Sequence, residues 1–279
     1  MIKYRIGNAT YNINDLNTPD GKFPGGEVGP SLNSERLNGF KVDEITVLAH
    51  LPNNDEIMKL LFVVDALRRE YGDVKLKAQI PYMPYARQDR VDAGNRGYAL
   101  GAVPMANLIN SLNFSEVVVL DPHSDVMCAL IKNIRITTQT DVFKCVHNDW
   151  SNIHIVAPDA GAYKKSSMFA KAVGAKGLIV CNKDRDPATG RITDLSMSAD
   201  VTGLNLFILD DICDGGRTFT ELAKLTTKAK RVELAVTHGL FTKGVDVVAN
   251  EFHAVYTTDS FLGYKPQVKE NVRYLKSIV

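Results

Sequence analysis

A run of acidic and glycine residues follows directly after an apolar stretch in the C-terminal half. Leu204–Leu209 is apolar, and the nine residues from Asp210 to Thr218 read Asp-Asp-Ile-Cys-Asp-Gly-Gly-Arg-Thr. A helical pattern starts at once, so the sequence predicts a strand, a tight turn and a helix N-terminus. Backbone N–H groups at such a helix start bind phosphate, and glycine lets the backbone approach the ligand closely. The two leading carboxylates suit ribose hydroxyls, or Mg²⁺ held through water. The plain alternative is a solvated connection with a capping threonine.

A basic and aromatic cluster follows a second predicted strand. Residues 81–90 read Pro-Tyr-Met-Pro-Tyr-Ala-Arg-Gln-Asp-Arg. Two guanidinium groups and an amide could clamp a polyphosphate, and a guanidinium also stacks on a base. By spacing alone a solvated loop explains this stretch about as well. The chain contains no Walker A motif, which argues against a P-loop kinase.

The elements that position these clusters alternate along the chain. Short β-branched apolar runs are separated by stretches of helical period, a pattern typical of βαβ units and a mostly parallel sheet. Strands are expected at Ile45–Leu51, Lys75–Pro81, Glu116–Asp121, Ile153–Ala157, Leu178–Cys181, Leu204–Leu209, Val232–Thr237 and Ala254–Thr258. Helices are expected at Asp55–Tyr71, with an inner stripe of Ile57, Leu60, Leu61, Val64 and Leu67, and near Val103–Leu112, Tyr163–Val173 and Thr218–Lys228. In open α/β sheets ligands bind beyond the carboxyl ends of strands, where each polar cluster lies.

Length and charge limit the organisation and the partners. With 279 residues the chain can form two halves, which we expect at 1–146 and 147–279, joined by the polar segment His147–Asn152. Lys and Arg number 33 against 32 Asp and Glu, a net charge of +1. No overall field therefore favours a nucleic-acid or membrane partner, and any anion site must be local.

Cysteine usage and hydropathy indicate the compartment. The four cysteines are scattered, without a CxxC pair or zinc spacing, which is typical of reduced thiols. No apolar run approaches the roughly 18 residues needed to span a bilayer, and the N-terminus lacks the apolar core of a signal peptide. We expect a cytoplasmic protein with no disulfide and no structural zinc.

Several motifs together resemble the ribose-phosphate pyrophosphokinase family. The similar stretches, in chain order, are Pro52-Asn53-Asn54-Asp55, Val64-Asp65-Ala66-Leu67-Arg68-Arg69, Ile80-Pro81-Tyr82 and Tyr85-Ala86-Arg87-Gln88-Asp89-Arg90. Further similar motifs are Asp121-Pro122-His123, Ala157-Pro158-Asp159-Ala160-Gly161, Asp210-Asp211-x-x-Asp214 and Thr237-His238. The resemblance covers roughly residues 45 to 245. It implies an α/β chain of two doubly wound, mostly parallel-sheet halves with the type I phosphoribosyltransferase-like fold.

The resemblance also implies an activity. The family transfers the β,γ-diphosphate of ATP to the anomeric hydroxyl of ribose 5-phosphate, with Mg²⁺, giving phosphoribosyl pyrophosphate and AMP. The hydroxyl attacks the β-phosphorus directly, so the protein supplies position and charge. The N-terminal half is expected to bind ATP and the C-terminal half the acceptor.

Site residues carry over by position. Arg87, Gln88 and Arg90 are expected to hold ATP, with Phe23 and Glu27 covering adenine from a neighbouring subunit. His123 and Asp159 are expected to bind Mg²⁺. Lys183 and Arg185 match the basic pair of a mobile catalytic loop and, with His123, form the expected catalytic set. The expected acceptor residues are Asp210, Asp211, Asp214, Gly215, Gly216, Arg217 and Thr218.

The sequence departs from the family pattern in three places. Phe23-Pro24-Gly25-Gly26-Glu27 stands where the family has Phe-Ser-Asp-Gly-Glu, so Gly25 replaces an acidic contact. Arg217 adds a cation to the acceptor loop. This cation either tightens the grip on ribose 5-phosphate, which we favour, or holds the diphosphate of ADP-ribose. The segment before Phe23 and the C-terminal region ending at Val279 are short for the family. We expect a homo-oligomer, a dimer or larger, without carrying over its exact assembly or its allosteric control.

Two other classes remain as alternatives. A non-catalytic regulatory homologue would have no physical reason to keep His123, Asp159, Lys183, Arg185 and Asp211 together, and all five are present. A transcription regulator on the same fold would need a basic helix-turn-helix region, which the sequence does not contain. The retained set favours an enzyme acting on small molecules.

Overall fold

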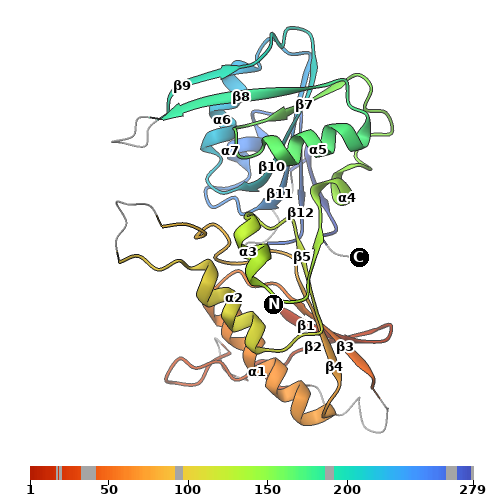
Figure 1. Cartoon of the computed structure of the whole chain (residues 1–279), viewed down its shortest axis with the longest axis vertical. Helices are drawn as coiled ribbons and strands as arrows, with labels where there is room; N and C mark the ends of the chain where they lie inside the picture. The colour runs from red at the N-terminus through yellow and green to blue at the C-terminus, as the bar shows by residue number, and fades with distance from the viewer. Residues whose placement is uncertain are drawn as a thin grey trace. The chain divides into compact units, whose positions relative to one another are not determined.

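The chain forms two compact units. The computed structural model describes residues 1–16, 18, 21–32, 42–91, 97–185, 192–261 and 269–277. Unit 1 contains Met1–Thr137 and Phe261, and unit 2 contains Thr138–Ser260 and residues 269–277. In Figure 1 the colour follows the chain from red in unit 1 to blue at the end of unit 2. The boundary after residue 146, expected from the polar segment that follows it, stays a prediction.

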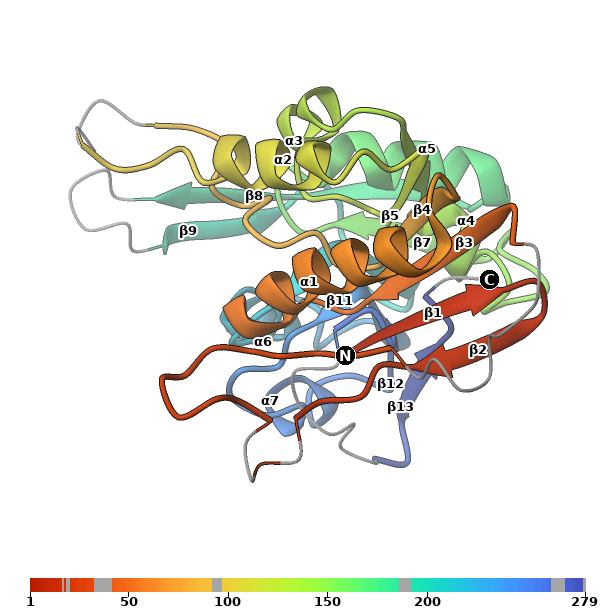
Figure 2. The ribbon, with the colours of Figure 1, turned by 90° about the horizontal axis from the view of Figure 1, so that it is seen from below.

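Unit 1 is built on a six-stranded sheet in the order β2-β1-β3-β4-β5-β6. Its strands are β1 (Ile2–Ile6), β2 (Ala9–Asn12), β3 (Glu44–Ala49), β4 (Lys75–Ile80), β5 (Glu116–Leu120) and β6 (Ile134–Thr137). The strands from β3 to β6 pair in parallel, as the alternating pattern predicts. The sequence analysis missed the antiparallel hairpin of β1 and β2, drawn in red in Figure 2, which extends the sheet beyond β3.

The helices of unit 1 are α1 (Asn54–Tyr71), α2 (Ala102–Ser111) and α3 (Asp125–Leu130). Helix α1 begins where the Asn53 side chain accepts the Glu56 N–H at 3.0 Å, and it ends at Gly72, whose φ is 62°. Its buried residues are Ile57, Leu60, Val63, Val64 and Leu67. The predicted stripe was therefore wrong at Leu61, which is half-buried, because the helix turns its Val63 flank to the core.

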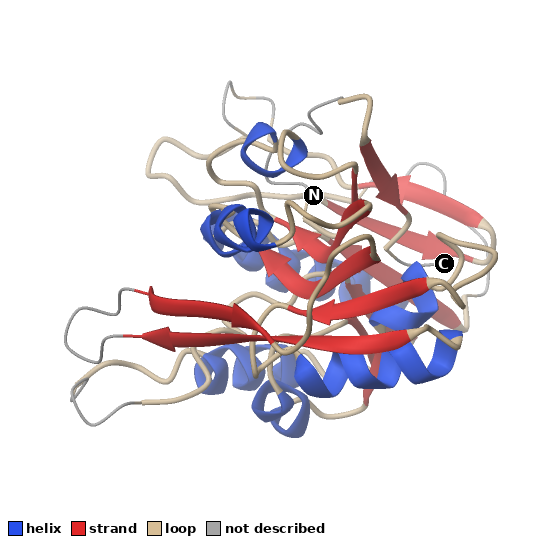
Figure 3. Cartoon of the chain, turned by 90° about the horizontal axis from the view of Figure 1, so that it is seen from above, coloured by secondary structure: helices blue, strands red, loops and turns tan. Residues whose placement is uncertain are grey.

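Unit 2 is built on a seven-stranded sheet in the order β13-β12-β11-β10-β7-β8-β9. Its strands are β7 (Ile153–Ala157), β8 (Gly177–Arg185), β9 (Ile192–Met197), β10 (Asn205–Cys213), β11 (Arg231–Gly239), β12 (Ala254–Thr258) and β13 (Val272–Leu275). All neighbours pair in parallel except β8 and β9. That antiparallel pair extends past the helices of unit 2 as a two-stranded ribbon (Figure 3).

Both faces of the unit 2 sheet are covered. The helices are α4 (Gln139–Phe143), α5 (Tyr163–Val173), α6 (Arg217–Leu225) and α7 (Asp246–Ala249). On β10, Phe207 stacks on Phe169 of α5 with ring centroids 6.0 Å apart. Its neighbour Ile208 belongs to the opposite cluster, which includes Phe219 and Leu222 of α6. Because successive residues of a strand point to opposite faces, this alternation confirms a doubly wound sheet.

Two strands of unit 2 are longer than the sequence predicts. Strand β10 continues through Asp210 and Asp211 to Cys213, because its pairing with β11 extends to the Ile212–His238 and Cys213–Gly239 positions. Strand β8 continues to Arg185 because β9 pairs with it. The two leading carboxylates of the acidic run therefore lie in a strand rather than in a loop.

Two further observations concern the chain as a whole. Its four cysteines are free thiols, with Cys181 and Cys213 buried. Within the described ranges, no helix is both long and apolar enough to cross a bilayer.

The segment predicted as a linker, His147–Asn152, packs onto unit 2. His147 Nε2 lies 2.6 Å from the Glu233 carboxylate on β11, and Trp150 packs edge-on against Phe207 at 5.0 Å. Glu233 is almost fully buried and also accepts hydrogen bonds from Arg231, at 2.9 and 3.0 Å, and from the Tyr256 hydroxyl, at 3.3 Å. The segment is anchored by a buried carboxylate with three partners.

This network predicts an acid-sensitive contribution to stability. Burial acts to raise the pKa of Glu233, but the hydrogen bonds and charges of His147 and Arg231 outweigh it, so the pKa is lowered. The contribution is complete above the ordinary glutamate pKa and is lost as pH falls through the lower folded-state value. We expect Glu233→Gln to reduce the free energy of unfolding at neutral pH by about 3 kcal/mol.

Denaturant unfolding across the acid range measures this effect. Glu221→Gln is the matched control, because Glu221 is a half-buried carboxylate of α6 paired with the exposed Lys224, and the substitution should reduce the free energy of unfolding by less than about 1 kcal/mol. An equal, small change in both variants would contradict the assigned role of Glu233.

Candidate functional site

In unit 1, two loops leave the sheet at the same edge. Strands β4 and β5 are parallel neighbours, and the Leu120 N–H donates to the Pro81 carbonyl at 3.3 Å. Residues 81–90 and the Asp121-Pro122-His123 segment therefore begin side by side. Arg87, Gln88 and Arg90 are exposed, as is His123.

The 81–90 loop is held by its own packing. Met83 and Ala86 are buried beneath it, and Tyr85 adopts a left-handed conformation with φ 61°. The Gln88 N–H donates to the Tyr85 carbonyl, and the Gln88 carbonyl accepts from Ala102, both at 3.0 Å. A Cβ at Gly101 would lie 2.2 Å from Gln88 Oε1 and 3.0 Å from Gln88 Cβ, so the Gln88 side chain packs directly against this glycine. The exposed basic side chains thus stand on a fixed backbone rather than on a simple solvated loop.

His123 is placed by a strained turn at the end of β5. Asp121 is buried and has φ 39°, which ends the strand one residue earlier than predicted. Its N–H donates to the Thr137 carbonyl at 2.8 Å. Ser124 then caps α3 by accepting the Val126 N–H at 3.0 Å. Strained backbone of this kind is typical of functional sites.

The Phe23–Glu27 segment forms a tight turn near the start of α1. The Phe23 N–H donates to the Glu27 carbonyl at 2.9 Å, and Lys22 pairs with Asp55 on α1 at 2.6 Å. The Tyr85 hydroxyl donates to Asn54 of the same helix turn at 2.8 Å. The N-terminal turn of α1 therefore anchors both this segment and the 81–90 loop, and Phe23 and Glu27 are exposed.

In unit 2, three carboxylates lie at the ends of two adjacent strands. Asp210 and Asp211 are on β10, and Asp159 lies two residues beyond β7, the parallel neighbour of β10. Burial, followed by the negative charges of Asp211 and Asp159, raises the pKa of Asp210 well above its ordinary value. One Asp159 oxygen accepts the Ala162 N–H at 3.1 Å. The structure thus brings the first acidic residues of the predicted acceptor loop close to the predicted metal ligand.

The turn after β10 leads directly into α6. Gly216 is the N-cap residue, in a left-handed conformation with φ 78°, and no side chain caps the helix. A Cβ at Gly216 would lie 2.9 Å from a Val247 methyl group, so both conformation and space require glycine. The N-cap residue of α6 therefore offers no side chain to its backbone N–H groups, and the capping threonine of the plain alternative is not observed. Arg217 is exposed and Thr218 is half-buried.

Cys213, within the same run, is an unsuitable nucleophile. Burial, with the negative charges of Asp210 and Asp214, raises the pKa of its thiol to about 12. The thiolate needed for nucleophilic attack is therefore scarce near neutral pH.

The loop after β11 completes this turn, and the sequence analysis missed it. The Thr242 hydroxyl donates to the Asp214 carboxylate at 2.7 Å, and the Thr242 N–H donates to the Asp214 carbonyl at 3.1 Å. The Lys243 stem lies over Gly215, with its Cδ 3.4 Å from the position of a Cβ there. The sequence signal that could have revealed this loop is its place in the chain. It directly follows β11, the strand that pairs with β10.

The remaining predicted residues are placed only by their backbone. Lys183 and Arg185 lie on β8, where they pair with Leu195 and Ile192 of β9. They are therefore in a hairpin rather than a loop, and their side chains lie outside the described part.

The two predicted metal ligands lie in different units, His123 in unit 1 and Asp159 in unit 2. Among the described residues no three His, Cys, Asp or Glu side chains cluster at metal-binding distance. Mg²⁺ in phosphate-transfer sites commonly uses one or two carboxylates with water and phosphate oxygens, so it does not require such a cluster.

Comparison with known proteins identifies the family. A family model described as the N-terminal domain of ribose phosphate pyrophosphokinase matches residues 9–112. The ribose-phosphate pyrophosphokinase of Marinomonas sp. (strain MWYL1) is 30% identical over 254 residues, covering 88% of this chain and 75% of the relative. That of Agrobacterium fabrum is 31% identical over 235 residues, covering 81% and 74%.

A solved structure shows the same fold. The phosphoribosylpyrophosphate synthetase from Mycobacterium smegmatis matches with a TM-score of 0.77 at 20% sequence identity, covering 97% of this chain and 88% of that one. The match confirms the expected α/β architecture of two mostly parallel halves. The chain, an enzyme, belongs to the ribose-phosphate pyrophosphokinase family.

Proposed function

We propose that this enzyme transfers the β,γ-diphosphate of ATP to the anomeric hydroxyl of ribose 5-phosphate, giving phosphoribosyl pyrophosphate and AMP. Membership of the family supports the reaction class. The observation that carries the proposal is the turn from β10 to α6, where two carboxylates precede an uncapped helix N-terminus. Such a turn offers acceptors for sugar hydroxyls and donors for a phosphate within a few residues.

The acceptor is proposed to bind along this turn. The N–H groups of Gly215, Gly216 and Thr218, together with the Arg217 guanidinium, would donate to the 5-phosphate. Asp210 and Asp211 would accept hydrogen bonds from the ribose hydroxyls. Asp214 is already oriented by Thr242, which fixes the turn before the ligand arrives.

ATP is proposed to bind at the unit 1 edge. Arg87, Gln88 and Arg90 would clamp the triphosphate. Phe23 would cover the adenine and Glu27 would accept from its amino group, reaching from a neighbouring subunit as in the family. We therefore propose a homo-oligomer in the cytoplasm, with unit 1 as the ATP side and unit 2 as the acceptor side.

Mg²⁺ fits the donor chemistry of the proposed site. Asp159 is partly exposed, and one of its oxygens is oriented by a backbone N–H, so its other oxygen suits a hard cation. We propose Asp159 and His123 as ligands of Mg²⁺ on the triphosphate. Bound there, Mg²⁺ would offset phosphate charge.

The reaction is proposed to proceed by direct displacement. The anomeric hydroxyl oxygen loses its proton to solvent and forms a bond to the β-phosphorus, while the bond from that phosphorus to the bridging oxygen breaks and AMP leaves with that oxygen. Lys183, Arg185 and His123 would stabilise the charge that develops on the transferred group and on AMP.

We keep ADP-ribose as the alternative acceptor because of the cations beside the turn. Lys243 lies over Gly215 of the turn, and Arg217 is the first residue of α6, so two exposed cations flank the turn. A cation in the first turn of a helix opposes the helix dipole and gains from an additional anion nearby. The diphosphate of ADP-ribose would supply that anion.

An acceptor assay tests the proposal. With Mg²⁺ and ATP, we expect AMP release that depends on ribose 5-phosphate, accompanied by equimolar phosphoribosyl pyrophosphate. ADP-ribose is offered separately. Release with ADP-ribose alone would replace the proposed acceptor, and release with neither would refute the activity.

A substitution tests the placement of Arg217. Because its guanidinium would contact only the acceptor, Arg217→Gly should raise the acceptor KM about tenfold and change the ATP KM much less. Steady-state kinetics with each substrate varied in turn gives both constants. Lys228→Gly, at an exposed cation beyond the other end of α6, is the control and should leave both unchanged. Equal rises in both KM values for Arg217→Gly would show that Arg217 does not belong to the acceptor turn.

A further inference from the structure

Helix α5 places a cation at the edge of the acceptor carboxylates. Lys165 lies in the first turn of α5, and its Nζ is 3.6 Å from Asp211 Oδ2 on β10. The Asp211 side chain is largely withdrawn from solvent, with 12% exposed, and the Lys165 side chain is half-buried, with 35% exposed. Lys165 belongs to none of the sequence motifs described above.

A lysine at this position does not stabilise helix α5. A positive charge in the first turn opposes the helix dipole, and α5 has neither an acidic residue in that turn nor a side-chain cap. The next residue, Ser166, is fully buried and donates to the Leu209 carbonyl of β10 at 3.4 Å. Leu209 and Asp211 point to the same sheet face, because they are two positions apart on one strand. The start of α5 is thus docked so that Lys165 meets Asp211.

Asp211 lies among other carboxylates, so a nearby cation stabilises it. Asp210 is adjacent on β10, with its Oδ1 accepting the Asp211 N–H at 2.9 Å, and its pKa is raised by burial and by the charges of Asp211 and Asp159. Like charges in a partly buried cluster repel strongly unless a cation offsets them. Lys165 supplies that charge from the face opposite the α6 turn.

The separation shows what kind of contact this is. At 3.6 Å the ammonium attracts the carboxylate but is beyond ordinary hydrogen-bond length, so the contact is mainly electrostatic.

We propose that Lys165 is a positioning residue of the acceptor site, which offsets the charge of Asp211 and holds its carboxylate in place to accept the ribose hydroxyls. This inference rests on the proposed function, since it concerns the acceptor of that reaction. Its specific consequence is a defect confined to acceptor binding, with ATP binding preserved.

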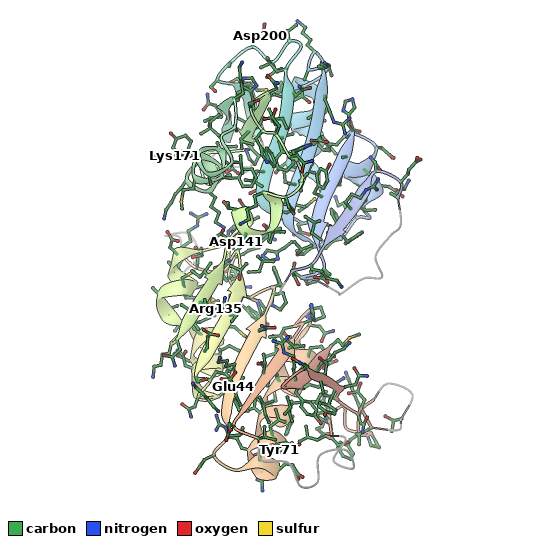
Figure 4. All side chains as sticks on the ribbon, turned by 90° about the vertical axis from the view of Figure 1, so that its right-hand side faces the viewer. Glu44, Tyr71, Arg135, Asp141, Lys171 and Asp200 are labelled. Atoms are coloured by element: carbon green, nitrogen blue, oxygen red, sulfur yellow. The ribbon has the colours of Figure 1, made fainter. Side chains whose placement is uncertain are left out.

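The test compares Lys165→Gln, Lys165→Arg and the control Lys171→Gln with the wild type. Lys171 is an exposed cation near the last turn of the same helix, labelled in Figure 4. We expect Lys165→Gln to raise the KM for ribose 5-phosphate about tenfold, with the KM for ATP within about twofold. Lys165→Arg should restore most of the acceptor affinity because it restores the charge, and Lys171→Gln should behave as wild type.

Direct binding separates this inference from the proposed function. Calorimetric titration of ribose 5-phosphate measures the acceptor Kd without turnover, and thermal unfolding confirms that each variant folds. If the wild type binds ribose 5-phosphate but does not release AMP, the proposed reaction is refuted. The inference about Lys165 is then still tested by the Kd values of the variants. Unchanged acceptor binding in Lys165→Gln, equal losses for both substrates, or no recovery in Lys165→Arg would overturn the inference, as would a wild type that does not bind ribose 5-phosphate.

Discussion

Mutual repulsion among carboxylates at the ends of two parallel strands is the constraint on which the rest of unit 2 depends. Strands β7 and β10 are neighbours, so Asp159, Asp210 and Asp211 converge where the sheet opens. Burial and like charge make this arrangement unfavourable in the free protein, as the raised pKa of Asp210 shows. Two devices oppose the repulsion: the N-terminus of α6 beyond the strand and Lys165 from α5.

The backbone that follows β10 is also restricted in its conformation. Gly216 must be glycine for conformation and for space, and the Thr242–Asp214 hydrogen bond ties the turn to the loop after β11. The turn is therefore formed before a ligand is present, which lowers the entropy lost on binding. In unit 1 the corresponding restriction is the left-handed backbone at Tyr85 and Asp121, which holds exposed Arg87 and His123 on fixed supports.

The sequence predicted the parallel core well, because buried strands and amphipathic helices have distinct periods. Strands β7 and β12 and helix α5 match the expected bounds. It failed where pairing partners decide the structure. The β1–β2 hairpin and the β8–β9 ribbon depend on antiparallel neighbours, and β10 runs on through Asp210 and Asp211 because β11 continues to pair with it. The acidic turn and the basic loop were recognisable from local motifs, whereas Thr242, Lys243 and Lys165 approach the turn only through tertiary packing.

The central claim is that the turn from β10 to α6 seats a sugar phosphate. A crystal structure with ribose 5-phosphate bound tests it most directly. The account predicts the phosphate within hydrogen-bond distance of the backbone N–H groups at the start of α6, and ribose hydroxyls donating to Asp210 and Asp211. A sugar phosphate bound instead on the 81–90 loop, with the α6 turn empty, would contradict it.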